Sequence, residues 1–371
     1  MIICRAYKTE LRPNNAQRSM FLKCAGAARF VYNWALADRK AVYEAGGKPS
    51  MYEQRRRFNA LKAEQYPWLS EIPSKAPEEA FAHVEAAFQN FFRRLRNGEK
   101  PGYPRFKSRK RGVGSFTLRG HIHIEADRIK LPRIGWVRLK ERGYLPQDGA
   151  CKLLSVCISE RAGRWYASAQ VEEEVADPIP GDGPVVGVDL GIKTLAVCSD
   201  GTAFENPRAL ANAERKLKRL QRELSRRRKG SKNRAKTKAK LARCHARIAN
   251  IRSHALHQVS YHLTAKNKPQ AVVIEDLNVK GMLNNRSLSK AISDVGMGEL
   301  RRQIEYKGTW YGVEVLTADR WYASSKTCSA CGAVNRALTL SDRTYVCAAC
   351  GAVIDRDLNA ALNLASLARA A

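Results

Sequence analysis

The chain has 371 residues, enough for two or three domains that each bury a core. Its 66 lysines and arginines against 35 aspartates and glutamates give a formal net charge of +31. Charge on that scale opposes compaction and predicts a polyanionic partner. There is no apolar run of about 18 residues, and the first residues lack a signal-peptide core, so nucleic acid is favoured over a membrane surface.

The ten cysteines do not have the distribution of a secreted disulfide framework. Four of them cluster near the C-terminus, while the other six are scattered between Cys4 and Cys244. Since no export signal is present, this pattern predicts one metal site and otherwise reduced thiols in a cytoplasmic protein.

The N-terminal part predicts a strand over residues 1–10 and then a small helical domain over residues 13–111. The first helix follows a cap at Pro13-Asn14-Asn15, and the second begins at about Pro77. Both carry apolar residues every three or four positions, among them Phe21, Phe30 and Trp34 in the first helix and Phe81, Val84, Phe88 and Leu95 in the second. Between the helices we expect little but charged connection.

A loop over residues 100–111 is predicted from its proline and glycine content. It interleaves aromatic and basic side chains, the combination that stacks bases and holds phosphates. The candidate nucleic-acid contacts are Tyr103, Arg105, Phe106, Lys107 and Arg109. A solvated basic linker is the alternative interpretation.

Residues 115 to about 175 change to the alternating pattern of strands. The segments His121–Glu125 and Gly135–Leu139 alternate, and Ala162-Gly163 marks a hairpin turn. Strands of this number and length predict a compact all-β barrel. Residues 177–184 read as a linker because they are rich in proline and glycine, and we place a domain boundary there.

Beyond the linker the pattern is that of an α/β domain. Apolar strands are predicted at 184–190, 194–199, 271–275 and 313–317, with a helix near 298–308 and another beginning at Asp355. The segment 214–247 predicts a long basic helical stretch, with sixteen Lys or Arg against two Glu. Such a run either contacts RNA or lies solvated, and the sequence leaves both open.

Two CxxC pairs lie near the C-terminus, fifteen residues apart, and each is followed by glycine. This spacing is typical of two tight turns that present four thiolates to one zinc ion. The ligands are Cys328, Cys331, Cys347 and Cys350. Because cysteine fills all four positions, the predicted zinc is structural rather than catalytic.

Three acidic positions stand out in the α/β part. Asp189 lies within an apolar strand and Glu275 ends another, where a carboxylate is costly unless it is paired or bound to metal. The third is in the pair Asp355 and Asp357, which opens the last helix. Residues two apart do not share a helix face. We therefore expect Asp355 to cap the helix and Asp357 to point inward, with Asp355 as the alternative third acid.

The three acids suit hydrolysis of a phosphodiester. That reaction uses two metal ions about 3.5–4 Å apart, one activating water and one stabilising the leaving oxygen. Hard carboxylate oxygens favour Mg²⁺ or Mn²⁺. Asp189, Glu275 and Asp357 are thus the candidate catalytic and magnesium-binding residues.

Several motifs together resemble the TnpB (OrfB) family of bacterial insertion sequences, compact relatives of type V CRISPR effectors. In the α/β part they are Gly187-Val-Asp-Leu-Gly191, Val273-Ile-Glu-Asp-Leu-Asn-Val-Lys-Gly281, the segment 321–332 around the first CxxC and the segment 350–361 around the last acids. In the N-terminal part they are Arg29-Phe-Val-Tyr-Asn-Trp34 and Gly102-Tyr-Pro-Arg-Phe-Lys-Ser108.

The resemblance implies a domain plan. The catalytic domain would be RNase H-like, of the RuvC type, over residues 184–320 and 353–371. The zinc ribbon would be inserted at 321–352. A helical recognition lobe at 13–111 would sit within a wedge barrel formed by 1–12 and 112–180.

It also implies an activity: metal-dependent cleavage of double-stranded DNA directed by a guide RNA from the transposon's end. The protein would act as a monomer in the ribonucleoprotein, at the nucleoid of a bacterium or archaeon, with no membrane partner. Guide pairing reads the sequence while the protein holds the heteroduplex by its backbone. The alternatives are a transposase that joins DNA ends, a non-catalytic repressor, and a ribosome or tRNA binder.

Overall fold

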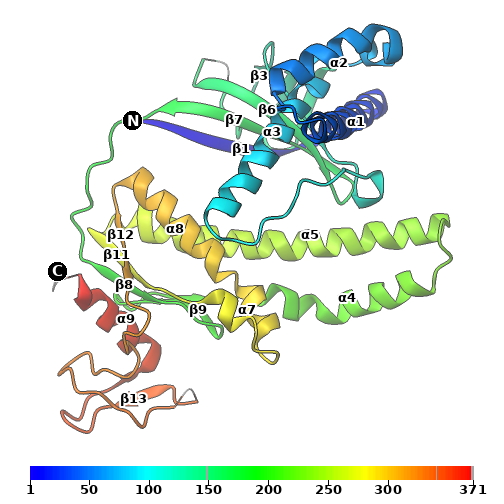
Figure 1. The fold of residues 1–371 in the computed structure, drawn as a ribbon. Helices are drawn as coiled ribbons and strands as arrows, with labels where there is room; N and C mark the ends of the chain where they lie inside the picture. Colours follow the sequence, from blue (N-terminus) through cyan, green and yellow to red (C-terminus); the bar gives the residue numbers. More distant parts are fainter. Residues whose placement is uncertain (148, 340, 369–371) are drawn as a thin grey trace. The chain divides into compact units, whose positions relative to one another are not determined.

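The computed structural model describes residues 1–147, 149–339 and 341–368. It divides the chain into two compact units, Met1–Val175 and Ala176–Ala371, drawn in Figure 1. No helix in the described ranges is long and apolar enough to cross a membrane.

Seven strands of the first unit form one antiparallel sheet. In chain order they are β1 (Ile2–Arg12), β2 (Ser115–Leu118), β3 (His123–Ile124), β4 (Arg128–Leu131), β5 (Gly135–Leu139), β6 (Lys152–Arg161) and β7 (Arg164–Glu174). They pair in the order β2-β6-β7-β1-β5-β4-β3. The N-terminal strand therefore lies in the middle of the sheet. The predicted hairpin is confirmed: Ala162 and Gly163 have φ of 57° and 82° at the β6–β7 turn.

The two predicted helices of this unit are α1 (Asn15–Glu44) and α3 (Lys75–Arg96). Asn14 caps α1 as expected, accepting a hydrogen bond from the Gln17 N–H. Phe21 of α1 packs against Trp165 of β7 at a centroid distance of 5.0 Å, which joins the helix to the sheet. A short 3-10 turn, η2 (Arg109–Arg111), ends the basic loop.

The expectation of a mere charged connection between α1 and α3 is wrong. The segment contains α2 (Met51–Gln65) and a 3-10 helix, η1 (Pro67–Glu71). Phe58 is its main apolar anchor, buried between Trp34 and Phe81 at centroid distances of 4.9 and 5.6 Å. One aromatic side chain does not make a periodic apolar stripe, so the sequence pattern did not reveal this helix.

The second unit is built on a five-stranded sheet, and its α/β class is confirmed. The strands are β8 (Val186–Asp189), β9 (Thr194–Cys198), β10 (Ala203–Glu205), β11 (Ala271–Glu275) and β12 (Glu314–Ala318). They pair in the order β10-β9-β8-β11-β12. The pairs β8–β11 and β11–β12 are parallel, while β9 is antiparallel to both β8 and β10.

Helices cover both faces of this sheet. One face contributes Val188 and Ile274 to a core shared with Leu300 of α8 (Met297–Tyr311) and Leu256 of α5 (Lys232–Tyr261). The other face packs Val273 against Leu364 of α9 (Arg356–Leu367). Smaller elements complete the unit: η3 (His262–Lys266), α6 (Val279–Met282) and α7 (Ser289–Val295).

The predicted basic helical stretch is two helices rather than one. α4 (Ala209–Arg226) and α5 run side by side as a hairpin that turns near Gly230, where φ is 84° (Figure 1). Leu217 and Leu220 of α4 pack against Cys244 and Ile248 of α5 in a small core of their own. The hairpin is therefore a folded arm of the second unit.

Candidate active site and metal centres

Asp189 and Glu275 end two adjacent parallel strands. Val188 of β8 is paired with Ile274 of β11, so each acid is the residue after a matched pair. Neighbouring strands lie about 4.8 Å apart, which sets the two backbones side by side. Successive side chains of a strand point to opposite faces of the sheet. Asp189 and Glu275 therefore point away from the face of Val188 and Ile274, toward the face that α9 covers. The sheet thus aims the two carboxylates the same way.

The third acid reaches this face because α9 packs very closely on β8. A Cβ on Gly187 would lie 2.9 Å from Cβ of Leu364 and closer still to backbone atoms of Ala361 and Ala365. Only glycine permits that approach. Asp357 lies one helical turn before Ala361, and Asp189 lies two residues after Gly187 in the chain. The contact of α9 with β8 therefore brings Asp357 toward Asp189.

Asp355 and Asp357 have different environments. One side-chain oxygen of Asp355 accepts the backbone N–H groups of Asp357 and Leu358, at 2.9 and 3.1 Å, as expected of an N-cap. The carboxylate of Asp357 is only 18% exposed and lies 3.2 Å from the guanidinium of Arg356. The cap therefore occupies the exposed Asp355, while Asp357 is the more buried of the two acids.

The electrostatics of Asp189 are consistent with this grouping. Burial raises its pKa to about 7, and the negative charges of Glu275 and Asp357 add to the effect. Arg356 opposes it, and the charge of Asp355 contributes least. This repulsion means that Glu275 and Asp357 both lie within electrostatic reach of Asp189. A cation placed among them would relieve it.

The three carboxylates are less compact than the cysteine group. Within the described ranges, the cysteine group alone has three or more ligand atoms that all lie within 4.8 Å of one another. The carboxylate oxygens of Asp189, Glu275 and Asp357 do not form such a group.

A hydrogen-bonded support stands behind Glu275, and the sequence did not reveal it. The Ser324 hydroxyl donates to Glu275 Oε1 at 2.6 Å. Asn363 of α9 is buried, and its amide donates to the carbonyls of Ser324 and Thr327 at 2.7 and 2.6 Å. Asn359, one turn earlier, donates to the Thr327 carbonyl at 2.7 Å. Repeated asparagines at helical spacing on an apolar face were the available signal.

Two hollows adjoin Glu275, which lines both of them. The larger, of about 340 Å³, runs along the segment from Ala318 to Lys326. The smaller, of about 280 Å³, lies between Leu190 and Arg301. Asp276 ion-pairs with Arg301 at 2.8 Å and with Arg320, and these partners lower its pKa. The two arginines thereby balance the negative charge of Asp276, which distinguishes it from the neighbouring Glu275.

The four cysteines form a compact tetrathiol group. The sulfur atoms of Cys328 and Cys350 are 3.7 Å apart, and those of Cys331 and Cys347 are 3.6 Å apart. Zinc–sulfur bonds of about 2.3 Å in a tetrahedron require sulfur separations of about 3.8 Å, so the geometry fits zinc. β13 (Thr344–Val346) and β14 (Val353–Asp355) form the hairpin of the ribbon.

Glycine permits the two metal-binding turns, as the sequence predicts. Gly332 and Gly351 have φ of 78° and 73°. Each donates its N–H to the carbonyl of the first cysteine of its pair, at 2.9 Å. Since β14 leads directly into α9, the ribbon and Asp357 are consecutive in the chain.

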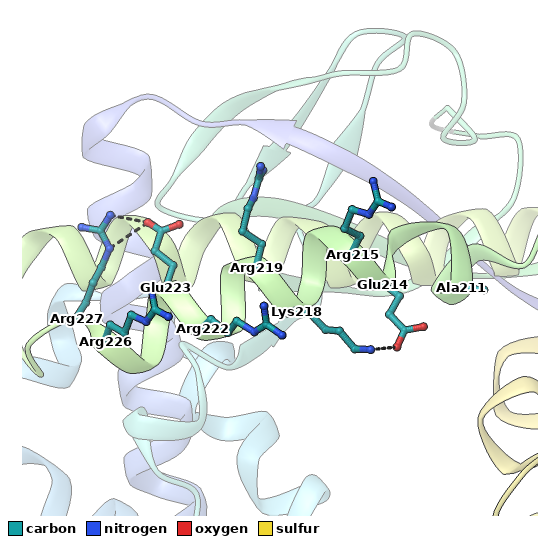
Figure 2. Close-up of a pocket in the computed structure, with 9 residues that line it drawn as sticks. All are labelled: Ala211, Glu214, Arg215, Lys218, Arg219, Arg222, Glu223, Arg226 and Arg227. Atoms are coloured by element: carbon teal, nitrogen blue, oxygen red, sulfur yellow. Dashed lines mark hydrogen bonds and ion pairs between the residues drawn. The ribbon is translucent and has the colours of Figure 1, made fainter.

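The basic arm presents a row of cations along α4. A groove of about 1070 Å³ is lined by Ala211, Glu214, Arg215, Lys218, Arg219, Arg222, Glu223, Arg226 and Arg227, shown in Figure 2. Lys218 and Arg227 are ion-paired with Glu214 and Glu223. Arg215, Arg219, Arg222 and Arg226 follow helical spacing and are exposed. They have no carboxylate partner within the described ranges.

The five candidate contacts of the 100–111 loop lie in the first unit and differ in their surroundings. Tyr103 and Phe106 are about half exposed, at 51% and 55%, and Arg105 and Arg109 are also exposed. Lys107 is instead anchored by the side chains of neighbouring residues. Its backbone exchanges two hydrogen bonds with the Asn33 side chain, and its Nζ lies 3.9 Å from the centre of the Tyr32 ring.

Comparison with known proteins gives consistent matches along the chain. The family described as "Probable transposase" of the OrfB_IS605 type matches residues 168–286. The "Cas12f1-like, TNB domain" matches residues 298–364, and the associated "Helix-turn-helix domain" matches residues 1–48.

Two relatives match over almost their full length. A Streptomyces pristinaespiralis protein named "Putative RNA-guided DNA endonuclease" is 38% identical over 99% of this chain and 90% of its own. The Escherichia coli (strain K12) protein named "Putative RNA-guided DNA endonuclease InsQ" is 35% identical over 97% of this chain and 91% of its own.

Among solved structures, the chain is similar to the protein in "Cryo-EM structure of the Cas12f1-sgRNA-target DNA complex". The TM-score is 0.55 at 17% identity, over 93% of this chain and 81% of that one. The chain thus shares the fold of that protein, with an α/β domain and a four-cysteine group that fits a zinc ribbon. The chain belongs to the TnpB (OrfB) family of insertion sequences.

Proposed function

We propose that this protein is an RNA-guided, metal-dependent DNA endonuclease of an insertion sequence. The observation that carries the proposal is that three acids gather toward one face of the five-stranded sheet. Asp189 and Glu275 end adjacent strands, and Asp357 is brought over them by α9, which packs against Gly187. The names of the two relatives above support the same activity.

In this proposal Asp189, Glu275 and Asp357 hold Mg²⁺ or Mn²⁺. Such ions activate water and stabilise the leaving oxygen of a phosphodiester. Ser324 fixes the orientation of Glu275 through its 2.6 Å hydrogen bond. Zinc at the four cysteines would be structural and would hold the chain that enters α9.

The partners would be a guide RNA from the transposon's end and a double-stranded DNA target. The +31 charge requires neutralisation by such polyanions. The unpaired arginines of α4 and the exposed side chains of the 100–111 loop would contact backbone phosphates and bases. We further propose that one copy of the chain acts in each ribonucleoprotein, at the nucleoid.

Purification from the native locus tests this function. The protein should carry a discrete RNA from the element's end, and the complex should cut DNA that matches this RNA when Mg²⁺ is present. Random RNA together with strand joining in the absence of RNA would indicate a transposase instead. A discrete RNA with target binding but no cleavage would indicate a repressor.

A further inference from the structure

Trp321 is displayed to solvent beside the candidate active site. Its side chain is 86% exposed, more than that of any other large apolar residue in the described part of the chain. A tryptophan normally buries most of its surface, because it is the largest apolar side chain. A ring exposed to this degree is free to stack on a ligand.

The backbone beneath Trp321 is fixed rather than loose. Trp321 follows the end of β12 after two residues, and its N–H donates to the side chain of Asp319 at 2.8 Å. The next residue, Tyr322, donates its N–H to the Asp319 carbonyl at 3.1 Å and its hydroxyl to the Asn363 carbonyl at 3.3 Å. Because the backbone of this turn is already ordered, a ligand that stacks on the ring has only the side-chain rotamer of Trp321 to fix.

The turn that carries Trp321 also adjoins the hollow that Glu275 lines, although Trp321 itself is not part of the lining. Ala318 of β12 is paired with Glu275 of β11, and Trp321 is three residues further along the chain. The Cα atoms of Trp321 and Glu275 are therefore at most about 16 Å apart. The residues on either side of the tryptophan, Arg320 and Tyr322, line the 340 Å³ hollow that Glu275 also lines.

The surroundings favour an unpaired base over a protein partner. Protein interfaces bury an aromatic side chain within an apolar core. Here the chain neighbours Asp319, Arg320 and Ala323 are polar or small, and the exposed Lys326 lines the same hollow. Every base has a π-face on which an aromatic ring can stack, whatever the sequence. The phosphate of the same nucleotide can pair with a nearby cation. Duplex bases are already stacked on one another, so the base must come from a single strand.

We propose that Trp321 is a positioning residue that stacks on an unpaired base of the DNA strand and holds that strand at the acids. This inference rests on the proposed function, because it assumes that the acids cut DNA. It adds that the strand is presented single-stranded and is held by stacking, without base-specific hydrogen bonds.

Fluorescence of 2-aminopurine tests the stacking directly. The probe is a set of short oligothymidine strands with one 2-aminopurine at successive positions, bound to full-length Asp189→Asn protein, which should not cut. At one position the fluorescence should be quenched at saturation. In the Asp189→Asn, Trp321→Ala double variant the quench should fall by at least half, and Trp321→Phe should retain most of it.

Cleavage of guide-matched DNA is the second readout, made with the purified RNA–protein complex. Trp321→Ala should slow cleavage by about 5- to 100-fold, since stacking of one base is worth that range. Trp321→Phe should recover most of the rate. Ile179→Ala is the matched control, because Ile179 is also exposed, at 84%, but lies in the linker predicted over residues 177–184. That variant should cut at the wild-type rate.

Unchanged quenching and an unchanged rate in Trp321→Ala would overturn the inference while leaving the endonuclease intact. Equal losses in the alanine and phenylalanine variants would also overturn it, because stacking survives in phenylalanine. If the unaltered complex cut no DNA, the proposed function itself would fail. The melting temperature should be the same in all single variants at Trp321, since an exposed side chain contributes little packing.

Discussion

Gly187 lies directly beneath the backbone carbonyl of Ala361, with no room for a side chain between β8 and α9. This contact fixes the height of α9 above the sheet and, with it, the position of Asp357. One glycine in a strand thereby couples packing to the arrangement of the acids.

Gly187→Ala should therefore damage both folding and cleavage. The methyl group would force α9 away from β8, at a cost of roughly 1–3 kcal/mol, typical of overpacking. We expect a lower melting temperature and cleavage below one tenth of the normal rate. Circular dichroism and a cleavage assay measure the two effects.

Gly298→Ala is the matched control for stability. Gly298 lies in α8 of the same unit, and a Cβ there would have no atom within 4 Å. The melting temperature should stay the same or rise, since alanine favours the helix. Equal destabilisation by the two substitutions would mean that the β8–α9 contact has no special role.

Substitutions of Asp355 and of Asp357 should have different effects on cleavage and stability. Asp355→Asn keeps a helix cap and should preserve cleavage, while Asp355→Ala should cost about 1 kcal/mol of stability. Asp357→Asn should abolish cleavage with little change in melting temperature. If Asp355→Asn abolished cleavage and Asp357→Asn did not, the assignment of the third acid would be reversed.

The raised pKa of Asp189 predicts a pH-dependent stability in the absence of metal. Its pKa rises from 3.8 to about 7 on folding, so the folded state binds the proton more tightly than the unfolded state does. The favourable contribution is complete below pH 3.8 and is lost as the pH rises through 7.

Asp189→Asn should remove that dependence. The variant should gain stability relative to the unaltered protein between pH 5 and pH 8, by roughly 1–4 kcal/mol, because each pKa unit corresponds to about 1.4 kcal/mol. Added Mg²⁺ should reduce the difference in stability between the variant and the unaltered protein at pH 8. Parallel pH–stability curves for the two proteins in EDTA would contradict the predicted burial and repulsion.

Asn363 should matter for cleavage although it is not one of the three acids. Removing its amide takes the donor from the buried Ser324 carbonyl, while the Thr327 carbonyl keeps the Asn359 amide, and we expect a cost of about 1–3 kcal/mol. It also frees the Ser324 segment that holds Glu275. Asn363→Ala should thus lower both melting temperature and rate, whereas Ser324→Ala should lower the rate with a smaller loss of stability.

The sequence predicts most of the second unit because its signals are local. The apolar strands around Asp189 and Glu275, the cap at Asp355 and the CxxC turns each depend on neighbouring residues. Gly187 and the family motifs correctly mark the strand beside the acids. The class of the fold and the family follow from these features.

The remainder depends on tertiary contacts that local patterns do not contain. α2 is held by one buried aromatic, Phe58, and by Gln54, whose amide donates to the Ala35 carbonyl at 2.7 Å. The support of Glu275 joins Ser324 to Asn363, residues brought together only when α9 packs on the sheet. Neither arrangement produces a periodic pattern in the sequence.

Cleavage by the three acid variants tests the central claim most directly. The complex is purified with its own RNA, and matched DNA is added with Mg²⁺. We predict that Asp189→Ala, Glu275→Ala and Asp357→Ala each retain the RNA and bind the DNA, yet cut at least about 100-fold more slowly, as expected when a catalytic metal ligand is lost. Wild-type cutting by any one of them would show that the three carboxylates do not act as one metal site.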